Sequence, residues 1–235
     1  MMTSESLAQA ITRAGGAVEL LRNQDWPAFT FPVAPEFTNW RDEQRAWNTT
    51  VALMDQSHHM TQLFLWGDDL IPMLSGISPN TFATFRPGVA KQLISVNQDG
   101  YLVGDGILFY NSDGPEGLVL IGHHLLIDWV RFNAEKAEAR GEDVHHRLEA
   151  NSHMRQGPPT FYRYELQGPR ADEVMEQVFG GPAPEIKFFH IGEVEIAGRP
   201  VRALRHGMAG QPGFEFYGPW ADNEVVLQAL LDAGA

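Results

Sequence analysis

The sequence predicts an α+β fold made of two related strand–helix–strand modules. The first observation is a repeated order of elements. A strand at residues 62–66 ends at Gly67, and about a hundred residues later a strand at 161–167 ends at Gly168. A short helix, several strands and a longer helix follow in each half. The second observation is composition, because 43% hydrophobic residues in a chain of 235 can form a sizeable core.

The N-terminal residues predict helices separated by an irregular segment. Residues 4–22 carry apolar side chains at helical spacing that is interrupted at Gly15-Gly16, which predicts two short helices. Residues 26–35 contain three prolines, so this segment is expected to be extended or irregular. Thr38 is expected to cap the helix that follows it.

The first module continues after the strand at 62–66 with a short helix at 68–74. Strands at 91–96 and 102–110 are joined by the turn Asn97-Gln98-Asp99-Gly100 and should form a hairpin. A strand at 118–121, a helix at 125–140 and a strand at 144–148 complete this module. Residues 150–159 are the expected linker to the second module.

The second module repeats most of this order. A helix at 169–179 begins with Pro169, which suits a first helical turn. Strands at 192–196 and 200–204, a strand around Glu215 and a helix at 221–233 follow. The chain stops just after this helix, so the second module is expected to lack a counterpart to the closing strand at 144–148.

Composition excludes several classes of function. The formal net charge is -13 and the pI is near 5.0, so a nucleic-acid partner is not expected. The chain has no cysteine, which excludes disulfides, thiolate nucleophiles and cysteine metal sites. We find no apolar segment typical of a signal peptide or a membrane span, and a cytoplasmic location is predicted.

The stretch 205–219 combines a glycine-rich loop with a short strand that carries Glu215. Side chains alternate in a strand, so Glu215 should point away from Phe214 and Phe216. The carboxylate is then either solvated on an outer face or paired inside the protein. Beside the accessible backbone of Gly213, it would suit a flat heterocycle that offers two adjacent N–H donors, such as a pterin ring.

The segment 55–59 ends in two adjacent histidines, His58 and His59. In a strand they would point to different sides, so both cannot face one ligand without a bend. One histidine in the core and one at the surface is the simplest interpretation, and one histidine beside a ligand is the alternative. We expect no metal, because no third ligand stands at a recognisable zinc spacing.

The Glu215 stretch resembles the pterin-contacting segment of the glycine-cleavage T-protein (aminomethyltransferase) superfamily. Further motifs resemble one branch, the tetrahydrofolate-dependent O-demethylases that act on vanillate and 3-O-methylgallate. The likeness covers nearly the whole chain, and its motifs occur in the family's order: residues 34–40, 55–60, 104–110, 187–189 and 204–210.

The resemblance implies the aminomethyltransferase folate-binding fold. Residues 1–55 and 143–235 would form the folate-fold domain, with its C-terminal part incomplete, and residues 56–142 an inserted α+β domain. Family members continue for roughly as many residues again and include a β-barrel domain, which would be absent here. The implied setting is one-carbon metabolism in aromatic catabolism and lignin degradation.

The resemblance also implies site residues and a cofactor. Tetrahydrofolate would be held by Glu215, Gln56, Gly213 and Met208. His59 or His58 would lie near the reacting groups, together with Asp105, which occupies the place of the second member of an aspartate pair. The alternative for Asp105 is an ordinary carboxylate at a turn or strand end. The predicted substrate-binding residues are His123, Phe29 and Phe31, and the aromatic pair could equally belong to the core.

Some positions depart from the family pattern. Phe29 and Phe31 stand where the O-demethylases have tyrosines, and His123 stands in a segment where they have an arginine. An arginine fork suits a carboxylate better than histidine does, so the substrate is expected to have lost or changed its carboxylate. Gly104 replaces the first aspartate of the pair, which argues against glycine-cleavage aminomethyl transfer.

Three interpretations follow. In the first, the chain is an O-demethylase that moves a methyl group from an aromatic methyl ether to tetrahydrofolate. Such an enzyme would be active as a homo-oligomer, as an offshoot of the family, or together with a second chain. In the second, the chain is a non-catalytic or incomplete folate-binding module. In the third, it is a glycine-cleavage-type aminomethyltransferase.

Overall fold

The computed structural model describes residues 5–23, 31–34, 37–208 and 210–234, in two units at 1–35 and 36–235. The first unit contains α1 (Leu7–Ala14) and α2 (Ala17–Arg22). Ser6 and Gln9 form a capping box at the start of α1, and Gly15 ends it with a φ of 81°. The prediction of two short helices broken at Gly15-Gly16 is confirmed.

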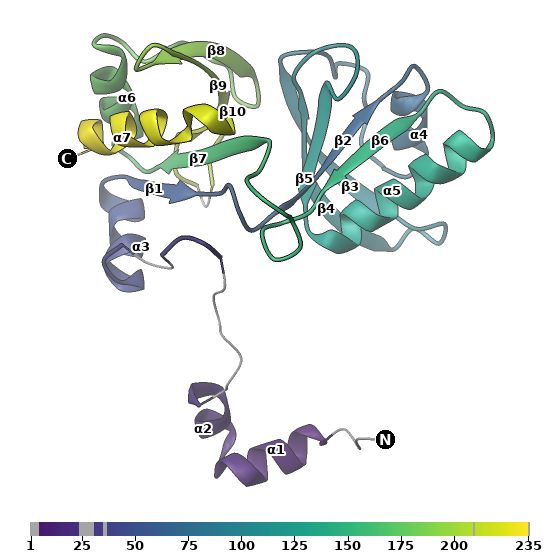
Figure 1. The fold of residues 1–235 in the computed structure, drawn as a ribbon, viewed down its shortest axis with the longest axis horizontal. Helices are drawn as coiled ribbons and strands as arrows, with labels where there is room; N and C mark the ends of the chain where they lie inside the picture. Colours follow the sequence, from purple (N-terminus) through teal and green to yellow (C-terminus); the bar gives the residue numbers. More distant parts are fainter. Residues whose placement is uncertain (1–4, 24–30, 35–36, 209, 235) are drawn as a thin grey trace. The chain divides into compact units, whose positions relative to one another are not determined.

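In its described part, the second unit contains two antiparallel five-stranded sheets, which we call sheet A and sheet B (Figure 1). Sheet A has the order β1 (Ala52–Asp55), β7 (Phe161–Gln167), β10 (Gly213–Pro219), β9 (Arg199–Arg205) and β8 (Ile191–Ile196). Sheet B has the order β6 (His145–Glu149), β2 (Thr61–Trp66), β5 (Leu118–Gly122), β4 (Leu102–Tyr110) and β3 (Val89–Val96). Apart from β1, which the sequence analysis does not predict, these strands match those that the sequence predicts, and they confirm the α+β class.

Each sheet carries its own helices (Figure 1). On sheet A these are α6 (Ala171–Phe179), the 3-10 turn η1 (Trp220–Asp222) and α7 (Asn223–Gly234), and on sheet B they are α4 (Leu70–Gly76) and α5 (His124–Ala139). Helix α3 (Trp40–Thr49) precedes β1. Asn39 rather than Thr38 caps α3, because the Asn39 side chain accepts hydrogen bonds from the backbone of Arg41 and Asp42.

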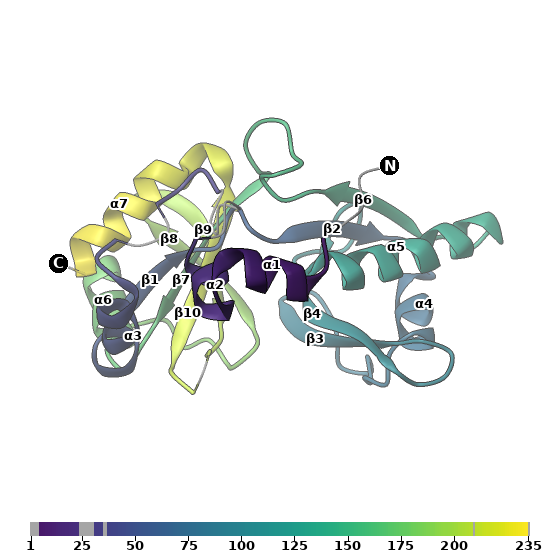
Figure 2. The same ribbon diagram turned by 90° about the horizontal axis from the view of Figure 1, so that it is seen from below.

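The two sheets have the same topology, and each is completed by a strand from a different place in the chain. Sheet A in the order β8-β9-β10-β7-β1 matches sheet B in the order β3-β4-β5-β2-β6. Strand β1 pairs antiparallel with β7 as β6 pairs with β2 (Figure 2). The expectation that the second module lacks a closing strand is therefore wrong. The strand comes from the segment before the first module.

Two glycines show how closely the modules correspond. Gly67 and Gly168 follow β2 and β7 with φ of 119° and 148°. A Cβ atom on Gly67 would lie 2.1 Å from the carbonyl oxygen of Asp143, and one on Gly168 would lie 2.4 Å from that of Thr50. The backbone N–H two residues after each glycine donates to the same carbonyl, at 3.1 and 3.0 Å. In both modules, glycine thus lets the closing strand approach.

Strand alternation places the core on both faces of each sheet. One cluster lies between sheet B and its helices α4 and α5, and a second lies between sheet A and its helices α6 and α7. The third cluster takes residues from both sheets, and we call the faces that supply it the inner faces: Phe64, Ala90, Phe109, Val119, Ile121, Leu204 and Tyr217. The division of the chain into a folate-fold domain and an inserted domain stays a prediction.

Candidate functional site

Strand β7 presents polar side chains on the inner face of sheet A. Tyr162, Tyr164 and Leu166 pack toward the helices. The alternate positions, Arg163, Glu165 and Gln167, are buried polar residues on the other face. A buried polar face of this kind needs internal partners, because unpaired buried charges are costly.

Glu215 lies on this inner face, opposite to Phe214 and Phe216 as the alternation predicts. Its side chain is 9% exposed, and its Oε1 accepts a hydrogen bond of 2.8 Å from Nη1 of Arg163. Of the two alternatives for this carboxylate, the structure therefore shows the paired one.

Glu165 brings a second carboxylate directly beside the first. Its Cα is in register with that of Glu215 on the neighbouring strand, an arrangement that repels like charges unless cations lie close. Nε2 of His206 lies 3.1 Å from Oε1 of Glu165 and 4.0 Å from Oε2 of Glu215. The amide of Gln56 donates to Oε2 of Glu165 at 3.1 Å. We call Arg163, Glu165, His206 and Glu215 the carboxylate cluster.

The surroundings of His206 in the carboxylate cluster favour its protonated, charged form. Burial by itself lowers the pKa of His206, but the hydrogen bond to Glu165 and the charges of Glu215 and Glu165 outweigh it, so the pKa lies above its ordinary value. With Arg163 permanently charged, the cluster therefore contains two acids and two bases, and protonation of His206 balances its charge.

The glycine-rich loop before β10 has a structural role of its own. A Cβ on Gly213 would lie 2.1 Å from the carbonyl oxygen of Leu166, so close strand packing already requires glycine there. Gly210 has a φ of 80° in the turn. The backbone N–H of Met208 donates to Oε1 of Gln167 at 3.2 Å, which ties the loop to β7.

The two histidines after β1 lie in a turn rather than a strand, so the strand assumed for them is wrong. His58 is buried, 3.8 Å from Asp55, with its ring 5.6 Å from that of Trp220. His59 is exposed. Partial desolvation lowers the pKa of His59 despite the opposing charges of Asp55 and Glu215. The charge of Glu215 therefore affects the pKa of His59 and not that of His58.

The remaining predicted residues fall in different surroundings. Asp105 is exposed and accepts a hydrogen bond of 2.8 Å from Gln92, and by alternation it shares the inner face with Phe109. His123 is exposed and caps α5. Phe31 belongs to the first unit, and Phe29 lies outside the described residues. Their assignment to a site stays a prediction.

The cluster suits a ligand that offers N–H donors. A carboxylate has about four acceptor positions, and the hydrogen bond from Arg163 uses one of those on Glu215. Oε2 of Glu215 therefore keeps acceptor capacity, and the exposed 9% of the side chain is where a donor edge would approach. The chemistry of the residues thus fits the pterin group of a folate. The sequence interpretation missed Arg163, Glu165 and His206, although the alternating charges of β7 were a visible signal.

Comparison with known proteins identifies the family. The model of the GCVT N-terminal domain matches residues 10–235. The chain belongs to this family. The resemblance inferred from the motifs is therefore confirmed at the level of the family.

Individual relatives agree with this assignment. Syringate O-demethylase of Sphingobium sp. (strain NBRC 103272 / SYK-6) is 43% identical over 98% of this chain and 49% of its own length. An aminomethyltransferase of Exiguobacterium sibiricum is 30% identical over 89% of this chain and 54% of its own. The chain spans about half the length of the curated relatives it matches.

A solved structure shows the same fold. The glycine cleavage system aminomethyltransferase T from Bartonella henselae aligns with a TM-score of 0.60 at 20% identity, over 81% of this chain and 48% of that one. No helix in the described part of the chain has the length and apolar character needed to cross a bilayer. The cytoplasmic location stays a prediction.

Proposed function

We propose that this chain is the folate-binding half of a tetrahydrofolate-dependent O-demethylase, which moves a methyl group from an aromatic methyl ether, such as a methoxybenzoate, to tetrahydrofolate. The observation that carries the proposal is Glu215, an acceptor held on the inner face by Arg163. The 43% identity to a syringate O-demethylase over nearly the whole chain supports the choice of reaction.

The residues of the cluster region would bind the cofactor. Glu215 would accept hydrogen bonds from the N–H donors of the pterin, and Gln56, which donates to Glu165, would lie beside the ligand. Gly213 and Met208 belong to the loop and strand start beside them. When bound, tetrahydrofolate supplies the nitrogen that accepts the methyl group.

Loss of the methyl group leaves a phenolate oxygen that needs a proton. We assign this proton transfer to His59, because its side chain is exposed and the charge of Glu215 affects its pKa. Its lowered pKa makes the protonated ring a stronger acid and a minor form at neutral pH. It is this protonated form that gives its proton to the phenolate oxygen, and the neutral ring then takes up a proton from solvent. We propose that Asp105, on the inner face of sheet B, lies near the reacting groups. We assign no proton transfer to His58, because it is buried.

The substrate would be a small aromatic ring. His123 is the residue we propose for its binding, and the roles of Phe29 and Phe31 stay predictions from the sequence. Histidine holds a carboxylate by a single contact and better when it is protonated, so a substrate without an ordinary benzoate carboxylate is favoured. The other half of the enzyme would come from further residues or from a second chain, because the relatives are about twice as long as the matched region.

Aminomethyl transfer is the second candidate, because a 30% identical relative is an aminomethyltransferase. Gly104 argues against it. A Cβ at Gly104 would lie 3.2 Å from Cβ of Leu126 on α5, so an aspartate there would need Leu126 to move by a few tenths of an ångström.

The first experiment measures tetrahydrofolate binding to the chain by calorimetry. Glu215→Gln should weaken binding by about tenfold or more, because a charge-assisted acceptor becomes neutral. Glu195→Gln, an exposed glutamate on β8 of the same sheet, is the matched control and should not change the affinity. Equal affinities of the wild-type chain and Glu215→Gln would contradict the proposal.

The second experiment separates an enzyme from a binding module. The chain is incubated with tetrahydrofolate and syringate, vanillate or guaiacol, and 5-methyl-tetrahydrofolate is quantified. Product identifies an O-demethylase, while binding without product identifies a module that needs its other half. A clear preference for vanillate over guaiacol would reject the idea that the substrate has lost its carboxylate.

A further inference from the structure

Arg163 is held by side chains from both sheets. It is 2% exposed and donates to Glu215 on sheet A at 2.8 Å and toward Gln62 on sheet B at 3.5 Å. Its guanidinium carbon lies 4.5 Å from the ring centroid of Phe109 and 4.8 Å from that of Tyr217. Contact with two aromatic rings whose planes are 77° apart restricts the rotation of the guanidinium, and hence the direction of its N–H donors.

The backbone of Arg163 is fixed as well. Its N–H donates to Oγ of Ser57 at 2.9 Å, and its carbonyl accepts from the backbone N–H of Gln56 at 2.9 Å. These contacts anchor the turn that carries His59. One residue therefore ties together Glu215, Gln56 and the histidine turn.

We propose that Arg163 is a positioning residue that keeps Glu215 ionised and in one orientation, with Oε2 left to accept N–H donors from a reduced pterin. Burial disfavours a charged carboxylate, so Glu215 needs a cation that cannot itself lose its proton. The part of this inference that concerns the ligand rests on the proposed function. The part that concerns the charge of Glu215 does not.

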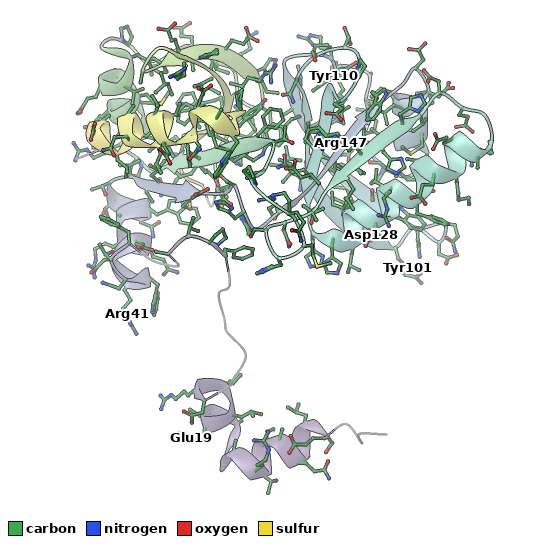
Figure 3. The ribbon with its side chains drawn as sticks, viewed as in Figure 1. Glu19, Arg41, Tyr101, Tyr110, Asp128 and Arg147 are labelled. Atoms are coloured by element: carbon green, nitrogen blue, oxygen red, sulfur yellow. The ribbon has the colours of Figure 1, made fainter. Side chains whose placement is uncertain are left out.

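Sheet B provides a matched control in Arg147, which is labelled in Figure 3. Arg147 also stacks on an aromatic ring, 3.9 Å from the centroid of Phe64, and pairs with Glu116 through Nη2 and Oε2 at 2.8 Å. Its side chain is 38% exposed, so water can replace the arginine when it is removed. Arg147→Met thus removes a similar pair whose acid, Glu116, is itself 38% exposed. The buried Glu149, 3.9 Å from Arg147, keeps its hydrogen bonds from Gln62 and Thr160.

The first test measures the tetrahydrofolate Kd of Arg163→Met, Arg163→Lys and Arg147→Met between about pH 5 and 8. Arg163→Met should weaken binding by about tenfold or more at neutral pH, and further as the pH falls, because the buried carboxylate then takes up a proton. Arg163→Lys should recover part of the loss, and Arg147→Met should match the wild-type chain. Unchanged affinity and pH profile in Arg163→Met would overturn the proposal.

Other titratable groups face Glu215 and must be separated from Arg163. They are Glu165 on β7, His206 in the loop after β9, His59 in the turn after β1, and Tyr217 on β10 itself. All of them are present in the wild-type chain and in the three variants. The difference between the wild-type and Arg163→Met profiles therefore reports the arginine.

The second test needs no folate. Carboxyl carbons of 13C-labelled glutamate are followed by NMR, with Glu215→Gln to assign the Glu215 signal. Between about pH 5 and 8, that signal should respond to pH differently in Arg163→Met and in the wild-type chain, because the variant leaves the buried carboxylate without its cation. If this holds but neither protein binds tetrahydrofolate, the positioning role stands and the proposed function fails. The same titration in both proteins would overturn the positioning role.

A third measurement keeps the proposal testable if Arg163→Met does not fold. The double variant Arg163→Met/Glu215→Gln removes the buried charge that the single variant leaves without its cation. It should be more stable to urea than Arg163→Met. A double variant that is as unstable as the sum of the two single changes would overturn the partnership of Arg163 and Glu215.

Discussion

Sheets A and B share one topology but differ in the chemistry of their inner faces. The register equates Phe64 and Val119 of sheet B with Glu165 and Glu215 of sheet A, because each pair is directly opposite on the equivalent strands. On sheet B these positions are apolar and buried, whereas on sheet A they carry two carboxylates. The comparison shows that a duplicated scaffold can keep one inner face for packing while the other supports a polar site.

The difference depends on cations as much as on carboxylates. Gln62 on β2 occupies the position equivalent to Arg163 on β7, and the two side chains meet across the inner faces at 3.5 Å. Sheet A can bury its carboxylates only because Arg163 and His206 lie beside them. The same acids on sheet B would lie near Arg147, but that arginine already pairs with Glu116.

The sharpest test moves a carboxylate to the other sheet. Val119→Glu should destabilise the fold by about 3–5 kcal/mol, because it buries a charge between Phe64 and Phe109. The arginines over these two rings already pair with Glu116 and Glu215, so the new carboxylate has no cation of its own. Val119→Ala, which only leaves a cavity, should cost about 1–3 kcal/mol. Urea denaturation measures both. If Val119→Glu costs no more than Val119→Ala, the inner faces do not differ as described.

The second test concerns what the modules share. Gly67→Ala and Gly168→Ala should each cost about 2–3 kcal/mol, because each Cβ meets a backbone carbonyl and each φ is positive. Gly100→Ala is the control, with a φ of 81° and open space around its Cβ, and should cost about 1 kcal/mol. Denaturation curves give all three values. A loss of stability in only one of the variants Gly67→Ala and Gly168→Ala would show that the two glycines do not have equivalent roles.

The third test uses pH to detect the polar face of sheet A. The pKa of His206 is raised in the folded state, so its stabilising contribution is full below about pH 6.5 and is lost as the pH rises through the folded pKa. The stability difference between the wild-type chain and His206→Gln should therefore be largest at acidic pH, about 1 kcal/mol, and shrink above neutrality. Urea denaturation across this range measures it.

His124→Gln is the control for this titration, because His124 is exposed on α5 beside sheet B. Its effect should be small at every pH. A His206→Gln difference that stays constant with pH would show that the imidazole does not gain charge on folding, and would remove His206 from the charge balance of the cluster.

Much of the fold was readable from the chain alone because its signals are local. The alternation of Phe214, Glu215 and Phe216 set the two faces of β10, and glycine after β2 and β7 marked the repeat. Period-two patterns and turn residues act within a few positions of the backbone, so neighbours in sequence suffice to reveal them.

Only the tertiary structure decided which partners meet. Strand β1 completes sheet A by pairing with β7, more than a hundred residues later, and Arg163 reaches Glu215 and Gln62 on different strands. Whether a carboxylate is solvated or paired depends on side chains that the fold brings from distant segments. The chain by itself thus determined the strands other than β1, their faces and the family, while the burial and the charge balance of Glu215 arose from long-range pairing.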